Sequence, residues 1–97
     1  MRKDIKNLIN FTSQVWKEGK IFVAYNPELG VASCGDDIEK AKNNLKEAVE
    51  LFIEEAIKLG TFDDILKESG FIKKKEEKKQ IWKAPELISF ERVCLAF

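Results

Sequence analysis

The chain has 97 residues, of which 44% are hydrophobic and 35% are charged, and its 17 basic and 17 acidic residues cancel. This length fits one domain and excludes two ordinary ones, while the hydrophobic content excludes global disorder. Without a net basic charge, the chain as a whole is not drawn onto nucleic acid or anionic lipid. We expect a single α+β domain over residues 1–97.

The first predicted strand covers residues 8–16, where side chains alternate between two sides as they do in a half-buried strand. Gly19, in the polar break that follows, supplies the positive φ of a tight hairpin, so residues 21–25 should return as an antiparallel strand. An Asn-Pro pair ends that strand, and Gly30 lets the chain turn again into a strand at 31–34. The three strands form a meander.

A long helix follows, and its start is well marked. Asp36 has a glutamate three residues later, as in a capping box, and Asp37 could alternatively cap the helix alone. Apolar residues recur every three or four positions over 38–57 and therefore share one face. Gly60 is typical of a helix end, and a short second helix is expected over 62–69.

Two further segments complete the predicted domain, whose core is expected over residues 8–60. Residues 72–83 carry six lysines against two glutamates with no apolar period, which indicates a charged loop or a fraying hairpin. Residues 87–96 are apolar and are predicted as a last strand that lies parallel to the first through a right-handed crossover. The predicted fold is β-β-β-α-(α)-β, with one mainly antiparallel sheet and helices on one face.

The chain contains no histidine, the side chain whose unperturbed pKa lies nearest neutrality. This excludes His-dependent nucleases and Ser-His triads. Glu28, Asp36 and Glu91 are too few for a nuclease built on carboxylates and metal, and no phosphate-binding loop sequence occurs. We expect a protein that is not an enzyme, with no catalytic residue, no metal and no cofactor.

Cys34 and Cys94 lie far apart in the sequence and form no metal-binding or redox motif. Cys34 lies near a helix N-terminus, where a thiolate can be stabilised, but without a histidine partner we interpret it as a small packed residue. The sequence shows no apolar run of about 18 residues, and the residues after Met1 do not resemble a signal peptide. We expect a cytoplasmic protein with reduced thiols and no membrane span.

Aromatic residues on the predicted strands could form a stacking platform for RNA: Phe11, Trp16, Phe22 and Tyr25. Because the helix must cover one sheet face, most of them should be core residues, with Trp16 and Tyr25 partly exposed at strand ends. Residues 26–69 carry eleven acidic residues against five lysines. In such acidic surroundings, exposed aromatic residues suit a protein partner better than RNA.

Three segments, 15–19, 23–36 and 44–51, carry a resemblance to a known family. Together they resemble the HicB-like antitoxin family in its short form, over roughly residues 9–57. The resemblance implies a truncated ribonuclease-H-like fold that lacks the nuclease carboxylates. It also implies a partner, a HicA-like toxin, which is a small basic protein that cleaves mRNA and is masked by the antitoxin.

The leading hypothesis is a non-catalytic antitoxin of a type II toxin-antitoxin system, whose acidic middle region favours approach to a basic toxin. Its expected contact residues are Tyr25, Glu28, Leu29 and Asp36. The sequence departs from the family in having Cys34 where glutamine is usual. No helix-turn-helix or ribbon-helix-helix segment follows, so DNA binding is not expected.

A small sheet leaves edges to be covered, so we also expect a homo-oligomer, either a dimer or a tetramer. Two alternatives to the antitoxin remain open. One is an orphan domain that acts only through self-association. The other is an RNA-binding sheet that uses the lysines of residues 73–79, whose binding would weaken steeply with salt.

Overall fold

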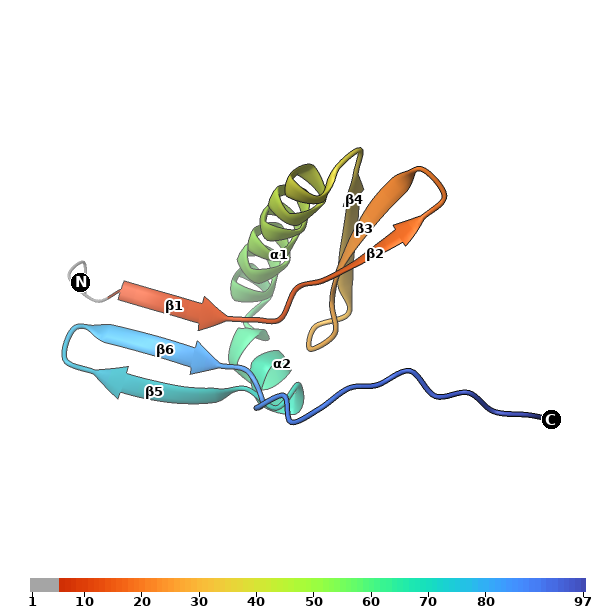
Figure 1. The fold of residues 1–97 in the computed structure, drawn as a ribbon. Coiled ribbons are helices and arrows are strands. Elements are labelled where there is room, and N and C mark those ends of the chain that lie inside the picture. The colour runs from red at the N-terminus through yellow and green to blue at the C-terminus, as the bar shows by residue number, and fades with distance from the viewer. Residues whose placement is uncertain (1–5) are drawn as a thin grey trace.

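The computed structural model describes residues 6–97, which form six strands and two helices (Figure 1). The strands are β1 (Lys6–Asn10), β2 (Gln14–Glu18), β3 (Ile21–Asn26), β4 (Val31–Gly35), β5 (Ile72–Glu76) and β6 (Lys79–Lys83), and the helices are α1 (Ile38–Leu59) and α2 (Phe62–Glu68). The α+β class is confirmed. The expectation that Met1 begins no signal peptide lies outside the described residues.

The strands of residues 6–97 form two three-stranded sheets, so the prediction of one sheet is wrong. The predicted meander is confirmed as the antiparallel sheet β2-β3-β4, in which Val23 lies between Trp16 and Cys34. The other sheet has the order β1-β6-β5, with β1 parallel to β6 and β5 antiparallel to β6. A parallel strand beside the first one was expected, but β6 occupies that place.

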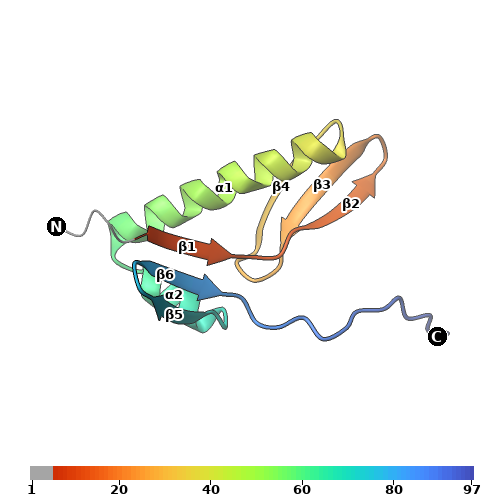
Figure 2. The ribbon, with the colours of Figure 1, turned by 60° about the vertical axis from the view of Figure 1, so that its left-hand side comes forward.

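The strand predicted over 8–16 is divided into β1 and β2 by residues 11–13, and this break separates the sheets. Phe11 packs against both core clusters, and the backbone N–H of Thr12 donates to the carboxylate of Glu28 instead of to a neighbouring strand. Figure 2 shows the result. β1 runs beside β6, the chain bends at residues 11–13, and β2 then runs beside β3.

Helix α1 covers one face of the β2-β3-β4 sheet (Figure 1). Asp37 is its N-cap, since the carboxylate accepts a hydrogen bond of 2.7 Å from the backbone N–H of Lys40. The helix ends at Gly60, whose φ of 74° is left-handed, as the sequence predicted. The first buried cluster joins this helix to β3: Ala24, Ala41, Leu45 and Val49.

The second buried cluster consists of Leu66, Phe71 and Trp82, so buried residues extend beyond the expected core range of 8–60. Phe62 at the start of α2 packs edge to face against Trp82, with ring centroids 5.7 Å apart. This cluster anchors the segment 72–83, which forms the β5-β6 hairpin instead of a charged loop. The lysines of β5 are exposed while Trp82 is buried.

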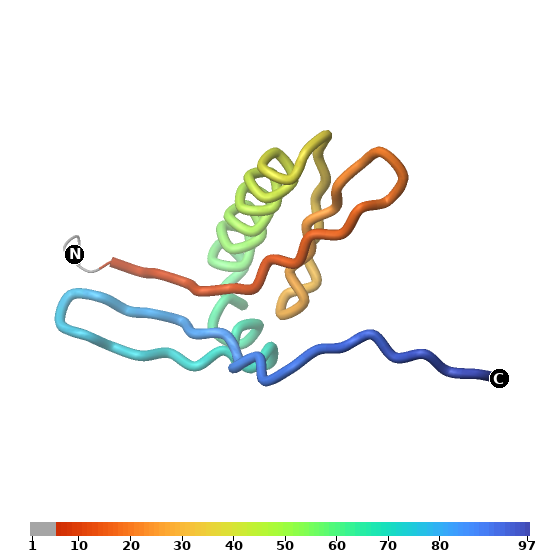
Figure 3. The backbone as a smooth tube through the Cα atoms, in the orientation of Figure 1, coloured from red at the N-terminus to blue at the C-terminus, as the bar shows by residue number. Residues whose placement is uncertain are grey.

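The last strand predicted over 87–96 is not formed, and the described residues 84–97 contain neither helix nor strand. Pro85 follows β6 closely, and proline has no backbone N–H with which to continue a ladder. The chain then leaves both sheets as an extended segment, which is the dark blue end of the tube in Figure 3.

Candidate functional site

The face of the β2-β3-β4 sheet turned away from α1 carries mainly apolar side chains. Ala24 packs against α1, so the strand alternation places Val23 and Tyr25, with their cross-strand partners, on the opposite face. Trp16 and Ile21 are each 46% exposed, and Tyr25 is 36% exposed. We call this surface the open face and define it by eight residues: Gln14, Trp16, Glu18, Ile21, Val23, Tyr25, Ala32 and Cys34. The predicted partial exposure of Trp16 and Tyr25 is confirmed.

Two of the predicted contact residues, Glu28 and Leu29, belong to an internal network. The carboxylate of Glu28 accepts hydrogen bonds from the backbone N–H of Thr12 at 2.9 Å, from the Thr12 hydroxyl, and from the side-chain amide of Asn26 at 2.7 Å. Asn26 is fully buried, and its amide oxygen accepts from the backbone N–H of Leu29 at 2.9 Å. Leu29 itself packs against both core clusters. Both residues therefore fix the turn over 27–30.

The other two predicted contact residues, Tyr25 and Asp36, are exposed but lie near opposite ends of β4. Tyr25 is paired with Ala32, near the start of that strand. Asp36 follows the strand, with its side chain 89% exposed and a carboxylate oxygen 3.9 Å from the Lys40 ammonium nitrogen. The four residues therefore do not converge on one surface: Tyr25 and Asp36 are exposed, whereas Glu28 and Leu29 are partly buried.

Both cysteines are free and exposed, so Cys34 is not the packed residue that the sequence suggested. It lies on the open face, and its backbone carbonyl accepts a hydrogen bond of 2.8 Å from the side-chain amide of Asn44 on α1. Across residues 6–97, no three or more Cys, Asp or Glu side chains are grouped so that they could hold a metal ion.

The solvent side of α1 carries an exposed leucine among acidic residues. Leu51 is 66% exposed, and helical spacing brings Glu47, Glu54 and Glu55, all exposed, next to it at four residues before and three and four after. We call these four residues the outer face of α1. Sequence reasoning noted the acidic bias of this region but missed Leu51, although its position opposite the apolar stripe could be read from the helical period.

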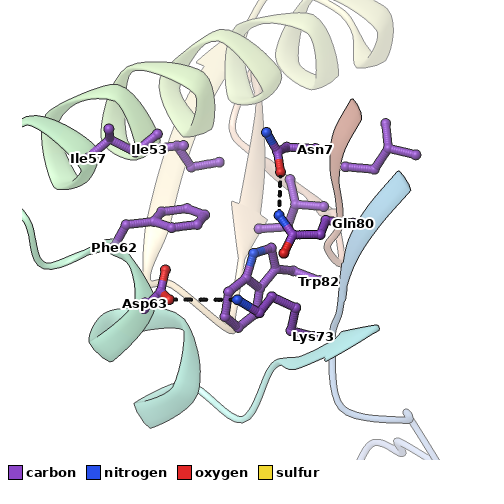
Figure 4. A pocket seen from close by; sticks show the side chains of 10 residues that line it. Asn7, Ile53, Ile57, Phe62, Asp63, Lys73, Gln80 and Trp82 are labelled. Atoms are coloured by element: carbon purple, nitrogen blue, oxygen red, sulfur yellow. Dashed lines mark hydrogen bonds and ion pairs between the residues drawn. The ribbon is translucent and has the colours of Figure 1, made fainter. Parts of the chain in front are cut away.

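A pocket of about 340 Å³ opens between α1, α2 and the β1-β6-β5 sheet (Figure 4). Its walls are largely apolar, with Ile53 and Ile57 from α1 and Phe62 from α2 facing Trp82. Sequence reasoning did not predict this pocket, because its walls come from segments that are distant in the sequence.

The four polar side chains that line this pocket are paired with one another. The Gln80 amide donates to the Asn7 amide oxygen at 2.9 Å, and these two residues are paired across β6 and β1. The ammonium nitrogen of Lys73 lies 3.9 Å from the Asp63 carboxylate and 5.2 Å from the centre of the Trp82 ring. Since these groups are engaged with each other, the pocket is better suited to an apolar side chain than to acid–base chemistry.

Comparison with family models, with curated proteins and with solved structures gives no match to this chain. Neither α1 nor α2, the helices of residues 6–97, combines the length and the apolar character needed to cross a bilayer. The assignment of a function therefore rests on the fold and on the surfaces described above.

Proposed function

We propose that this chain is a non-catalytic antitoxin-like protein that binds and masks a HicA-type mRNA-cleaving toxin. The observation that carries the proposal is the outer face of α1, where Leu51 is exposed among three glutamates. An apolar anchor surrounded by polar groups is a common composition of protein interfaces. The negative charge suits a small basic partner, because complementary charges accelerate association and fix the orientation of the complex.

The order of the elements also supports this proposal. The HicB resemblance implies a truncated ribonuclease-H-like fold, and the three-strand meander followed by a long helix agrees with the element order expected for it, whereas the second sheet does not. β1 and β2 act as consecutive halves of one bent strand, with β6 beside the first half and β3 beside the second (Figure 2). The three hydrogen bonds that the Glu28 carboxylate accepts are internal, so this carboxylate stabilises the turn beside the sheet.

Co-expression with a basic HicA-type toxin tests the proposal. We expect the two proteins to purify together and the toxicity to be relieved. The double variant Glu47→Lys with Glu54→Lys should weaken binding at least about tenfold, because it replaces attraction by repulsion beside Leu51. Glu76→Lys, an exposed charge change on β5, is the matched control and should bind normally. A toxin that neither binds nor loses its toxicity would refute the proposal.

The exposed residues Tyr25 and Asp36 remain proposed contacts of the toxin. Asp36 precedes α1 and pairs with Lys40, which falls on the solvent side of that helix by its spacing from Leu51. Tyr25→Ala and Asp36→Lys, measured separately in the same co-purification, show which end of β4 the toxin approaches. We expect Asp36→Lys to have the larger effect.

Self-association alone is the second candidate function, and it is favoured by the uncovered open face. The RNA-binding alternative retains Trp16 and Tyr25 as stacking residues, because Phe11 and Phe22 pack against the core. Binding of the chain to itself, without rescue from the toxin, would favour the second candidate. Binding to single-stranded RNA that falls steeply with salt would favour the third.

A further inference from the structure

The segment of residues 86–97, which we call the C-terminal arm, exposes an unusual number of large apolar side chains. Six of them are at least 61% exposed: Leu87, Ile88, Phe90, Val93, Leu95 and Phe97. In an extended chain, Ile88 and Phe90 lie on one side while Leu87 and Val93 lie on the other. Apolar residues on both sides are typical of a strand that is covered on both faces.

The whole molecule exposes more surface than a compact monomer of its mass. The accessible area is 7852 Å² for 11.2 kDa, whereas about 5,700 Å² is expected for a monomeric globular protein of this mass. The radius of gyration is 15.9 Å, whereas a compact domain of this length has one of about 12.5 Å. The excess area, about 2,000 Å², is larger than the roughly 800 Å² that each partner buries in a standard stable interface.

We propose that the C-terminal arm of one copy covers the open face of a second copy and that the second arm covers the first copy in return. The protein is then a homodimer with a reciprocal interface. Each chain contributes both halves of this interface, an apolar arm and an apolar sheet face, as a two-fold contact requires. This inference gives the self-association candidate a defined interface and does not depend on toxin binding. In the dimer Tyr25 lies under the arm of the second copy, so Asp36 is the proposed toxin contact that stays exposed.

The path of the arm explains why the arm covers a second copy and does not fold back onto the open face of its own chain. The guanidinium of Arg92 lies 5.3 Å from the centre of the Trp16 ring, so the arm passes the edge of its own open face at this point. Figures 1 and 3 show the dark blue end of the chain running away from both sheets. The apolar residues beyond Arg92 therefore remain uncovered unless another molecule provides the surface.

The distribution of charge favours a second copy over an unrelated charged protein. The open face has one charged residue, Glu18, among its eight members, and the three charged residues of the arm, Glu86, Glu91 and Arg92, sum to −1. The outer edge of the β1-β6-β5 sheet is different, because β5 presents the lysines of residues 73–75, which discourage edge-to-edge pairing. The open face and the arm, which are mainly apolar, are the surfaces that remain to associate.

The native cysteines provide a direct test, because Cys34 lies on the open face and Cys94 lies in the arm, and both are free and exposed. The full chain is prepared in light and ¹⁵N-labelled forms, mixed, and treated with a short bis-maleimide. We expect a covalent dimer in which Cys34 of one isotopic form is joined to Cys94 of the other. Cys34→Ser and Cys94→Ser should each abolish this product.

Light scattering coupled to size-exclusion chromatography gives the second readout. We expect twice the mass of 11.2 kDa at concentrations from about 10 to 200 μM, with Val93→Asp shifting the protein to the monomer. Leu51→Asp, on the outer face of α1, is the matched control and should remain dimeric. Circular dichroism verifies that both variants are folded.

Three results would overturn the inference: a monomer over the whole concentration range, a Cys34–Cys94 link found only within one copy, or a dimer that Val93→Asp does not affect. These measurements contain no toxin. A failure here therefore leaves the toxin-binding proposal standing, and a failure of toxin binding leaves the dimer standing.

Discussion

Glu28 joins two parts of the chain that are distant in the sequence, the bend at Thr12 and the turn over 27–30. Its carboxylate accepts three hydrogen bonds, one of them from Asn26, whose side chain is completely buried. A buried amide that loses its acceptor has no water to replace it, so the network stabilises the fold by more than a surface contact would.

Replacement of Glu28 should distinguish hydrogen bonding from charge. Glu28→Ala removes the acceptor for three donors and should lower the free energy of unfolding by about 2–4 kcal/mol. Glu28→Gln should cost less than about 1 kcal/mol, because the amide oxygen can keep two bonds while its NH₂ donates to the Thr12 hydroxyl. Urea unfolding at one fixed protein concentration measures both changes.

Glu86→Ala, at an exposed glutamate, is the control and should change stability by at most about 0.5 kcal/mol. Equal losses for Glu28→Ala and Glu28→Gln would mean that the negative charge, and not the set of hydrogen bonds, is what the turn requires.

The sequence predicted the conformation of this turn but not the role of its carboxylate. Proline and glycine have strong local preferences, and Gly30 indeed has a left-handed φ of 72°. The donors for Glu28 include Thr12, sixteen residues away, and a single sequence does not state that these residues meet. The sequence therefore predicts Glu28 as a partner contact and does not reveal its hydrogen bonds to Thr12.

At the scale of elements, the junction between β4 and α1 depends on close packing at Gly35. A Cβ atom at this position would lie 2.6 Å from the backbone nitrogen of Ala41 and 2.8 Å from the Cβ of Lys40. The backbone of a capped helix cannot move away easily, so Gly35→Ala should destabilise the protein by about 1–3 kcal/mol.

NMR chemical shifts should locate the effect of Gly35→Ala in the first turn of α1, and urea unfolding gives its size. Ala32→Ser, an exposed change on the same strand, should leave the stability within about 0.5 kcal/mol of the original. Unchanged shifts at Lys40 and Ala41 would show that the helix does not pack against Gly35 as described.

The β5-β6 hairpin shows that one buried residue can determine the structure of a highly charged segment. The lysines of β5 are exposed, whereas Trp82 is 3% exposed and packs with Leu66 and Phe71. The charge run concealed this in the sequence, because the apolar pair Ile81-Trp82 is too short to show a period.

Trp82→Ala should therefore release the hairpin, with a loss of about 3–5 kcal/mol. Lys74→Ala, at an exposed position of β5, should change stability by no more than about 0.5 kcal/mol. Amide hydrogen exchange reports the location, and we expect the protection of β1 and β6 to fall before that of α1. Equal loss of protection in both sheets would show that they unfold as one unit.

At the scale of the molecule, local patterns predicted the meander, the long helix and its two ends, but not how the segments combine. The single sheet was wrong because Phe11 and Thr12 turn inward and interrupt an alternating pattern that looks continuous. The apolar pattern of residues 87–96 predicted a strand within the sheet, but in the structure this segment is extended and exposed. The pattern contains no information about whether a covering surface belongs to the same chain.

Removal of residues 87–97 should consequently leave the fold intact. Both core clusters draw their members from residues 9–84, so the shortened chain keeps all of its buried contacts. The contact between Arg92 and the Trp16 ring is on the surface and is the one described interaction of the arm that would be lost. We expect unchanged helical circular dichroism and unchanged hydrogen-exchange protection of α1.

The same truncation should change the size and the surface of the particle. A compact chain of residues 1–86 has a radius of gyration of about 12 Å. Small-angle X-ray scattering can compare this radius with that of the full chain. Binding of a hydrophobic dye should rise if the arm normally covers the open face of a second copy, because removal of the arm exposes Trp16, Ile21 and Tyr25. It should fall if the arm is merely an exposed apolar segment. A loss of helical signal would instead mean that the arm contributes to the fold of its own chain, which the absence of arm residues from both clusters argues against.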